Sequence, residues 1–177
     1  MSEPVVSGPG DGERLERDRL SRDLLGVWNG REIDKSDGFL LLFEQISGAV
    51  RYALAYHRAL ATLPTPLSAR AAIHHGPIVL RENASGDVAR GAKPLEVEGL
   101  AKPLAARVMA LAAGGQTLLT AAAHARLMAS GIDDRWRLRT HGHWHLKGVD
   151  EPVEVFEIGD EAAPMSPPVD GAKAWRV

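Results

Sequence analysis

The segment that decides the fold covers residues 105–119 and has the sequence AARVMALAAGGQTLL. Apolar residues recur at helical spacing around its start, at Leu100, Leu104, Val108 and Leu111. This spacing predicts a helix with one buried face, and the pair Gly114-Gly115 ends it because glycine readily closes a helix. Residues 116–120 then predict a strand. A helix that returns directly into a strand indicates a sheet with helices packed on it.

The segments on either side add further helices and strands. Residues 13–28 and 46–61 have helical apolar spacing, and residues 121–130 are short and rich in alanine. One strand is predicted to begin at Arg31. After the turn Asp37-Gly38, further strands are predicted at 39–43, 70–75, 77–81, 136–146 and 153–158, and residues 82–92 predict a polar loop. Helices and strands alternate irregularly and the last strands are adjacent. The predicted class is therefore α+β, with a mixed or antiparallel sheet covered by helices.

Length and composition indicate one domain with loose ends. The chain has 177 residues, of which 45% are hydrophobic, and this suffices for one core. Residues 1–12 are rich in glycine and proline and predict a flexible leader, whereas 159–177 predict a proline-rich linker or tail. The domain itself is expected to span residues 13–158.

Charge and cysteine content exclude several classes of function. The formal net charge is −2 and no basic face stands out, so we expect no nucleic-acid partner. The chain has no cysteine, which excludes disulfides and thiolate chemistry. No opening apolar run is long enough for a signal peptide or a membrane span. We expect a cytoplasmic protein that does not bind membranes.

Five stretches together resemble the class III adenylate/guanylate cyclase catalytic domain. They are KSDGFLLLF at 35–43, AIHHGP at 72–77, EVEG at 96–99, AARVMALA at 105–112 with GGQTLL at 114–119, and LKGV at 146–149 with EPVEVF at 151–156. Each alone is a weak signal, but five in the family's order are strong. The resemblance implies a ferredoxin-like fold and conversion of ATP to cyclic AMP and pyrophosphate. It also implies a head-to-tail homodimer, Mg²⁺ or Mn²⁺ held by two aspartates, and in similar proteins a C-terminal regulatory region.

The same resemblance assigns roles to three residues, and the chemistry of their side chains supports these roles. Asp37 matches the second metal aspartate, although an Asp before Gly is also a common β-turn pair. Arg107 matches the arginine that stabilises the transition state, which suits the fixed donors of a guanidinium. Lys147 matches the lysine that binds the triphosphate.

Two further positions match the residues that recognise the base. Glu96 stands where adenylate cyclases have Asp, and a carboxylate there accepts a hydrogen bond from the adenine amino group, which favours ATP. Lys35 is the candidate for the other base-binding residue. The spacing before Asp37 is about one residue shorter than the common pattern, so Asp34 or Ile33 are alternatives.

The sequence departs from the family at two places. Nothing matches the first metal aspartate or its opening strand, which lies before the predicted helix at 13–28, and both true loss and truncation explain this. Pro103 stands where the family has an Asn that orients the ribose, and proline has no side-chain donor. These departures keep open a second hypothesis, a degenerate cyclase domain that binds nucleotide or dimerises without turnover.

Three alternating histidines, His141, His143 and His145, are the other candidate metal site. Alternation places them on one face of a strand, but the sequence offers no closing ligand at zinc-site spacing. A structural role is the better interpretation.

Overall fold

The computed structural model describes residues 9–35, 38–161, 163 and 165–177. Its helices are α1 (Pro9–Val27), α2 (Ile46–Ala61), α3 (Ser85–Val88), α4 (Ala101–Met109) and α5 (Ala121–Ser130). Its strands are β1 (Gly30–Lys35), β2 (Phe39–Phe43), β3 (Ala71–Ile73), β4 (Val79–Glu82), β5 (Leu95–Glu98), β6 (Thr117–Thr120), β7 (Arg137–Leu146), β8 (Val153–Gly159) and β9 (Ala174–Arg176). The predicted α+β class is confirmed.

The main sheet has five strands in the order β3-β6-β8-β7-β9, and β3 pairs in parallel with β6 while the other pairs are antiparallel. Strand β6 is buried on both faces because helices cover both. Leu118 packs with α4 in one apolar cluster, and Leu119 packs with α2 and α5 in another. Both leucines have no exposed surface. Successive side chains of a strand point to opposite faces, so the α4 layer lies on the opposite face of the sheet from α2 and α5.

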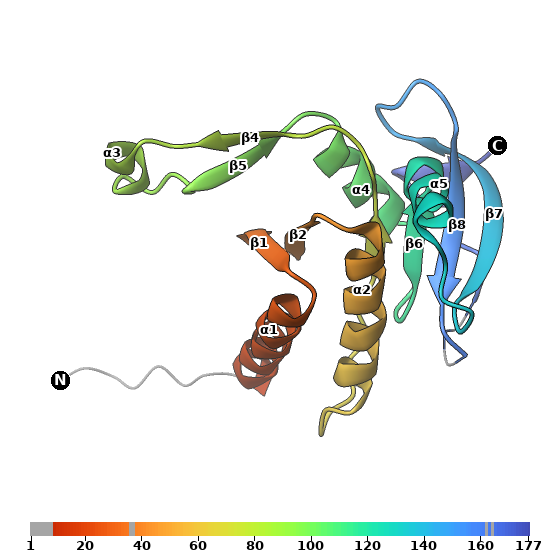
Figure 1. The fold of residues 1–177 in the computed structure, drawn as a ribbon, viewed down its shortest axis with the longest axis horizontal. Coiled ribbons are helices and arrows are strands. Elements are labelled where there is room, and N and C mark those ends of the chain that lie inside the picture. Colours follow the sequence, from red (N-terminus) through yellow and green to blue (C-terminus); the bar gives the residue numbers. More distant parts are fainter. Residues whose placement is uncertain (1–8, 36–37, 162, 164) are drawn as a thin grey trace.

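A second unit lies on the other side of α2, as Figure 1 shows. It consists of α1 and the antiparallel hairpin β1-β2. Leu25 of α1 packs with Tyr52, Tyr56 and Leu60 of α2, and the apolar residues of β2 lie against this cluster. Within the described residues, β1 and β2 pair only with each other and not with the main sheet. This division agrees with the prediction that the family's opening strand is missing.

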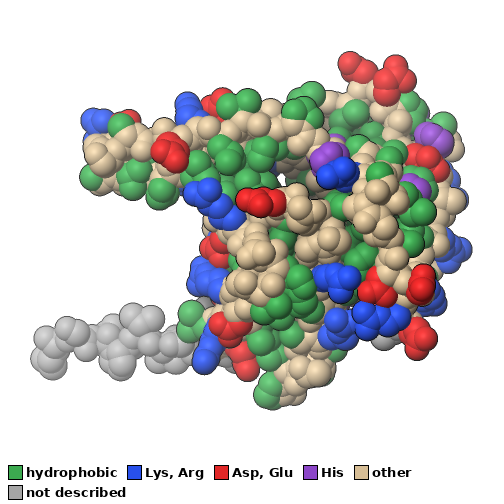
Figure 2. Space-filling model, in the orientation of Figure 1, with side chains coloured by type: hydrophobic (Ala, Val, Ile, Leu, Met, Phe, Trp, Pro, Cys, Tyr) green, Lys and Arg blue, Asp and Glu red, His purple; other side chains and the backbone are tan. Residues whose placement is uncertain are grey.

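Strands β4 and β5 form a ribbon that projects from the body and carries α3 at its tip (Figure 1). Apolar side chains lie along this arm in Figure 2, and Val79 and Leu80 of β4 are 61% and 43% exposed. Strand β4 agrees with the predicted strand at 77–81. The sequence did not predict β5, and the predicted loop at 82–92 contains the single turn of α3.

The C-terminal segment is more ordered than its composition predicts. Residues 159–177, predicted as a linker or tail, carry β9, which pairs with the outer edge of β7. Likewise α1 begins at Pro9, within the predicted leader. None of the helices in the described ranges is long and apolar enough to cross a membrane.

Candidate nucleotide site

Arg107 and Lys147 meet at the end of α4 that lies against β7. Arg107 is partly exposed in the last turn of α4, and its Nε donates a hydrogen bond to the carbonyl oxygen of Lys147 at 3.0 Å. Lys147 follows β7 directly and its side chain is exposed. The bond thus holds the Arg107 side chain against the backbone of Lys147, and both residues carry a positive charge at this surface. Such a pair can bind the oxygens of an anion such as a triphosphate.

Arg107 retains most of its donors. A guanidinium has five N–H groups, and only the Nε group bonds to another residue in the part of the chain that the structure describes. The terminal amino groups are therefore those that would contact phosphate.

Glu96 lies on β5, in the arm, and pairs with Arg81 of the neighbouring strand. The same guanidinium also contacts Glu98 at 3.1 Å. The hydrogen bond from Arg81 lowers the pKa of Glu96 below its usual value, so this carboxylate is ionised at neutral pH. It is an acceptor, as base recognition requires, but it already has a partner.

Lys35, at the end of β1, pairs with Asp18 of α1. Asp18 is only 4% exposed and also accepts from Arg17 at 3.2 Å. A buried carboxylate needs cationic partners, and these two contacts supply them. Lys35 therefore fastens the hairpin to α1 in this single chain.

Asp34 forms the centre of a junction that the sequence did not identify. Its carboxylate contacts Lys93 at 2.5 Å and Lys102 at 3.1 Å. The hydrogen bond from Lys93 is the main cause of a lowered pKa at Asp34. These contacts join β1 to the arm, at the α3 side of β5, and to the first turn of α4. No motif marks Lys93 or Lys102, since their roles depend on long-range packing.

Helix α4 links the two parts of the candidate site. Lys102 in its first turn reaches the Asp34 junction, and Arg107 in its last turn reaches Lys147. Five residues of helix correspond to a rise of about 7.5 Å. The structure thus brings Arg107 and Lys147 together and places Lys35 and Glu96 on the nearby strands β1 and β5, each in a separate ion pair. Pro103 lies in the first turn of α4, where a missing N–H costs no helical bond.

The described residues do not make a site for a pair of divalent metal ions. Asp37, the predicted metal ligand, lies outside the described residues. Among those that are described, no group of three or more His, Asp or Glu side chains could hold a metal ion.

The three alternating histidines do not share one environment. A register shift lies between Thr140 and His143, and Gly142 has a φ of 77°. His141 is buried and pairs with Glu157 at 2.7 Å. His143 is exposed, and the ring of His145 lies 5.8 Å from that of Trp175. Of the three, only His141 belongs to the buried interior.

Comparison with solved structures identifies the fold. An adenylate cyclase from Trypanosoma brucei superposes with a TM-score of 0.70 at 23% identity, covering 88% of this chain and 81% of that one. The adenylyl cyclase CyaB from P. aeruginosa superposes with a TM-score of 0.71 at 13% identity, covering 89% of this chain and 86% of that one. The guanylate cyclase domain of RhGC from Catenaria anguillulae, in complex with GTP, superposes with a TM-score of 0.68 at 10% identity. The match covers 88% of this chain and 87% of that one. The fold is that of a class III nucleotide cyclase catalytic domain.

Of the comparisons with known proteins, the one with solved structures finds this cyclase fold. No protein-family model matches the sequence, and no curated protein matches it either. The similar structures include adenylate and guanylate cyclases, so the cyclase fold by itself does not decide between ATP and GTP.

Proposed function

We propose that this protein is a nucleotide cyclase that converts ATP to 3',5'-cyclic AMP and pyrophosphate in intracellular signalling. The observation that carries the proposal is the contact between Arg107 and Lys147 within a cyclase fold. Both cations come from the motifs that resemble the family. Their adjacency supplies the positive charge that a triphosphate needs.

The reaction forms one bond and breaks one. The 3'-oxygen of the ribose attacks the α-phosphorus and loses its proton, and the bond from that phosphorus to the pyrophosphate oxygen breaks. Negative charge grows on the phosphoryl oxygens during this transfer. The terminal N–H groups of Arg107 would stabilise that charge, and Lys147 would bind the triphosphate.

To bind the base, Lys35 and Glu96 would have to exchange their present ion-pair partners for groups of the nucleotide. The ionised carboxylate of Glu96 suits the adenine amino group, since guanine presents a carbonyl acceptor at that place. Arg81 and Asp18 are the competing partners. Mg²⁺ or Mn²⁺ would neutralise charge on the triphosphate, with Asp37 as its candidate protein ligand.

A head-to-tail homodimer would complete the site. Asp37 of one protomer would face the Lys35, Glu96, Arg107 and Lys147 of the other.

The second candidate is a domain that binds nucleotide or dimerises without turnover. It is favoured by the separation of the β1-β2 hairpin from the main sheet and by Pro103 in α4. This candidate retains triphosphate binding by Arg107 and Lys147 but no cyclic product.

The test is cyclic AMP formation from ATP with Mn²⁺ at protein concentrations that force dimerisation. Wild-type chain, Asp37→Ala and Arg107→Ala are compared with Arg90→Ala, which removes an exposed arginine at the tip of the arm. Turnover that is lost in the first two variants and kept in Arg90→Ala supports a cyclase. Binding of ATP by folded wild-type protein without any product favours the second candidate.

A further inference from the structure

We propose that residues 165–177 form a strap that positions Arg107 and Lys147 for the triphosphate. The inference rests on the proposed function of this pair. It assigns a role in the site to a segment whose composition indicates only a linker.

The main chain of Lys147 is held from two sides. Its N–H donates to the carbonyl oxygen of Lys173 at 2.9 Å. Its own carbonyl oxygen accepts from the Nε of Arg107 at 3.0 Å. One residue thus connects the strap to the arginine, and a shift of Lys173 moves the anchor point of the Arg107 guanidinium.

Lys147 needs this support because of its place in the chain. It follows the last residue of β7 and precedes Gly148, whose φ is 80°. Glycine at such a conformation leaves the backbone free to adopt others. An exposed lysine beside a turn glycine is mobile unless its backbone is bonded, and the bond to Lys173 provides that constraint.

Side chains fasten the strap to β7 near its C-terminal end. The guanidinium of Arg176 lies 5.5 Å from the ring centroid of Trp144, a residue that is 1% exposed. The N–H of Arg176 donates to Asp170 at 2.9 Å, and the N–H of Val177 donates to the carbonyl of His143 at 3.0 Å. These contacts keep β9 in register with β7.

A buried polar network holds the other end of the strap. Gln116 is fully buried, and its side-chain amide donates to the carbonyl of Ser166 at 2.6 Å and to Glu157 at 3.1 Å. Glu157 in turn contacts His141 at 2.7 Å. Arg139 donates to the carbonyl of Met165 at 2.7 Å. The path of the strap is therefore specified at both ends.

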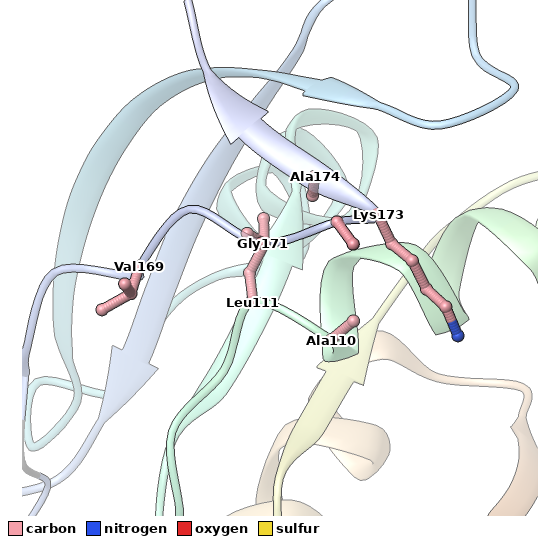
Figure 3. A pocket seen from close by; sticks show the side chains of 7 residues that line it. Ala110, Leu111, Val169, Gly171, Lys173 and Ala174 are labelled. Atoms are coloured by element: carbon pink, nitrogen blue, oxygen red, sulfur yellow. The ribbon is translucent and has the colours of Figure 1, made fainter.

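Between its two ends the strap spans the end of α4 without filling the space beneath it. Figure 3 shows Ala110 and Leu111 below Gly171 and Ala174, with Lys173 at one side and Val169 at the other. They line a cavity of about 250 Å³.

The experiment uses the full chain with the double substitution Asp170→Ala and Arg176→Ala. Its matched control is Asp23→Ala with Arg126→Ala, which removes one exposed charge of each sign, on α1 and on α5. Three quantities are measured: hydrogen exchange of the Lys147 amide by NMR, the affinity for a non-hydrolysable ATP analogue with Mn²⁺, and the affinity for adenosine.

We expect the Lys147 amide of the strap variant to exchange at least about tenfold faster, because local opening becomes easier. Affinity for the ATP analogue should fall about five- to tenfold, since charge-assisted contacts to phosphate lose their geometry. Adenosine affinity should stay unchanged, because adenosine has no phosphate. A general loss of structure would instead weaken both ligands.

Two results would overturn the strap proposal: unchanged exchange at Lys147, or faster exchange with unchanged affinity for the ATP analogue. If unaltered protein fails to bind the ATP analogue, the proposed function falls first, and the strap role falls with it. Should the double variant fail to fold, Val177→Pro replaces it, because this change removes the N–H that bonds to His143.

Discussion

Arg107 has a structural contact and a proposed chemical role, and the two can be separated by substitution. Its Nε bond to Lys147 orients the side chain, whereas its terminal amino groups bond to no other described residue. Lysine at this position would keep one charge but lose the planar set of donors. The difference between Arg and Lys at position 107 therefore reports on donor geometry, and the difference between Lys and Ala reports on charge.

We predict that Arg107→Ala and Arg107→Lys both lower the rate of cyclic AMP formation by about 100-fold or more, the usual effect of removing a donor to a charged transition state. Thermal unfolding should shift little, because the side chain is partly exposed. Initial rates and melting curves check this. A Lys variant with near-normal rate would show that charge alone suffices.

Gly30 is a position where any side chain would collide with its neighbours. A Cβ there would lie within van der Waals overlap of Leu25 and of the ring of Phe43. These atoms belong to the cluster that joins α1 and the hairpin to α2. The glycine is thus a requirement of close packing.

We expect Gly30→Ala to lower the free energy of unfolding by about 1–3 kcal/mol, the typical cost of overpacking. Gly26→Ala is the matched control, because a Cβ at Gly26 in α1 meets no atom within 4 Å. Alanine in a helix should be neutral or stabilising by up to about 1 kcal/mol. Urea denaturation distinguishes the two, and equal effects would contradict the packing argument.

Elements with strong local patterns were predictable from sequence, whereas those fixed by distant contacts were not. Helix α2 has the predicted bounds because its apolar residues recur every three to four positions. Helix α5 also matches, and Thr120 caps it by accepting from the N–H of Ala123. Strand β5 is four residues long, and β9 is three. Segments this short carry no clear period.

The candidate site shows the same limit. Motifs identified Arg107 and Lys147, but their contact joins residues 40 positions apart. The ion pairs of Lys35 with Asp18 and of Asp34 with Lys102 likewise depend on how α1 and α4 pack against the hairpin. Sequence patterns name such residues without naming their partners.

The packing of α2 on β6 makes stability depend on pH through His57. Its Nε2 lies 2.9 Å from the hydroxyl of Thr117, and burial lowers its pKa below 6.5 despite opposing effects of the Gln116 backbone and Asp160. The unfolded chain then binds the proton more tightly than the folded chain. Stability from this group is complete above about pH 6.5 and is lost as the pH falls through the folded pKa.

We therefore predict that the free energy of unfolding falls between pH 7 and pH 5 by about 1 kcal/mol more in wild-type protein than in His57→Gln. The control is His143→Gln on β7, which is exposed. Urea titrations at both pH values give the comparison. Identical pH slopes in wild type and His57→Gln would rule out this role of His57.

The molecule consists of a five-stranded sheet with helices on both faces, a separate hairpin unit with α1, and a projecting arm. Arg107 and Lys147 belong to the first part, and Asp37, which lies outside the described residues, falls between β1 and β2 in the sequence. In the proposed dimer, a complete site takes Asp37 from one protomer and the cations from the other. Two variants that are each inactive alone can then restore activity when one protomer of each forms a mixed dimer.

The decisive measurement is cyclic AMP formation by a mixture of Asp37→Ala and Arg107→Ala proteins at equal concentration. Each variant alone should be inactive. Random exchange of protomers gives one intact site in each mixed dimer, so the mixture should regain about a quarter of the wild-type rate if the dimer is symmetric. A mixture that stays inactive while wild type turns over would contradict a site shared between protomers, and wild-type protein that makes no cyclic AMP would contradict the cyclase itself.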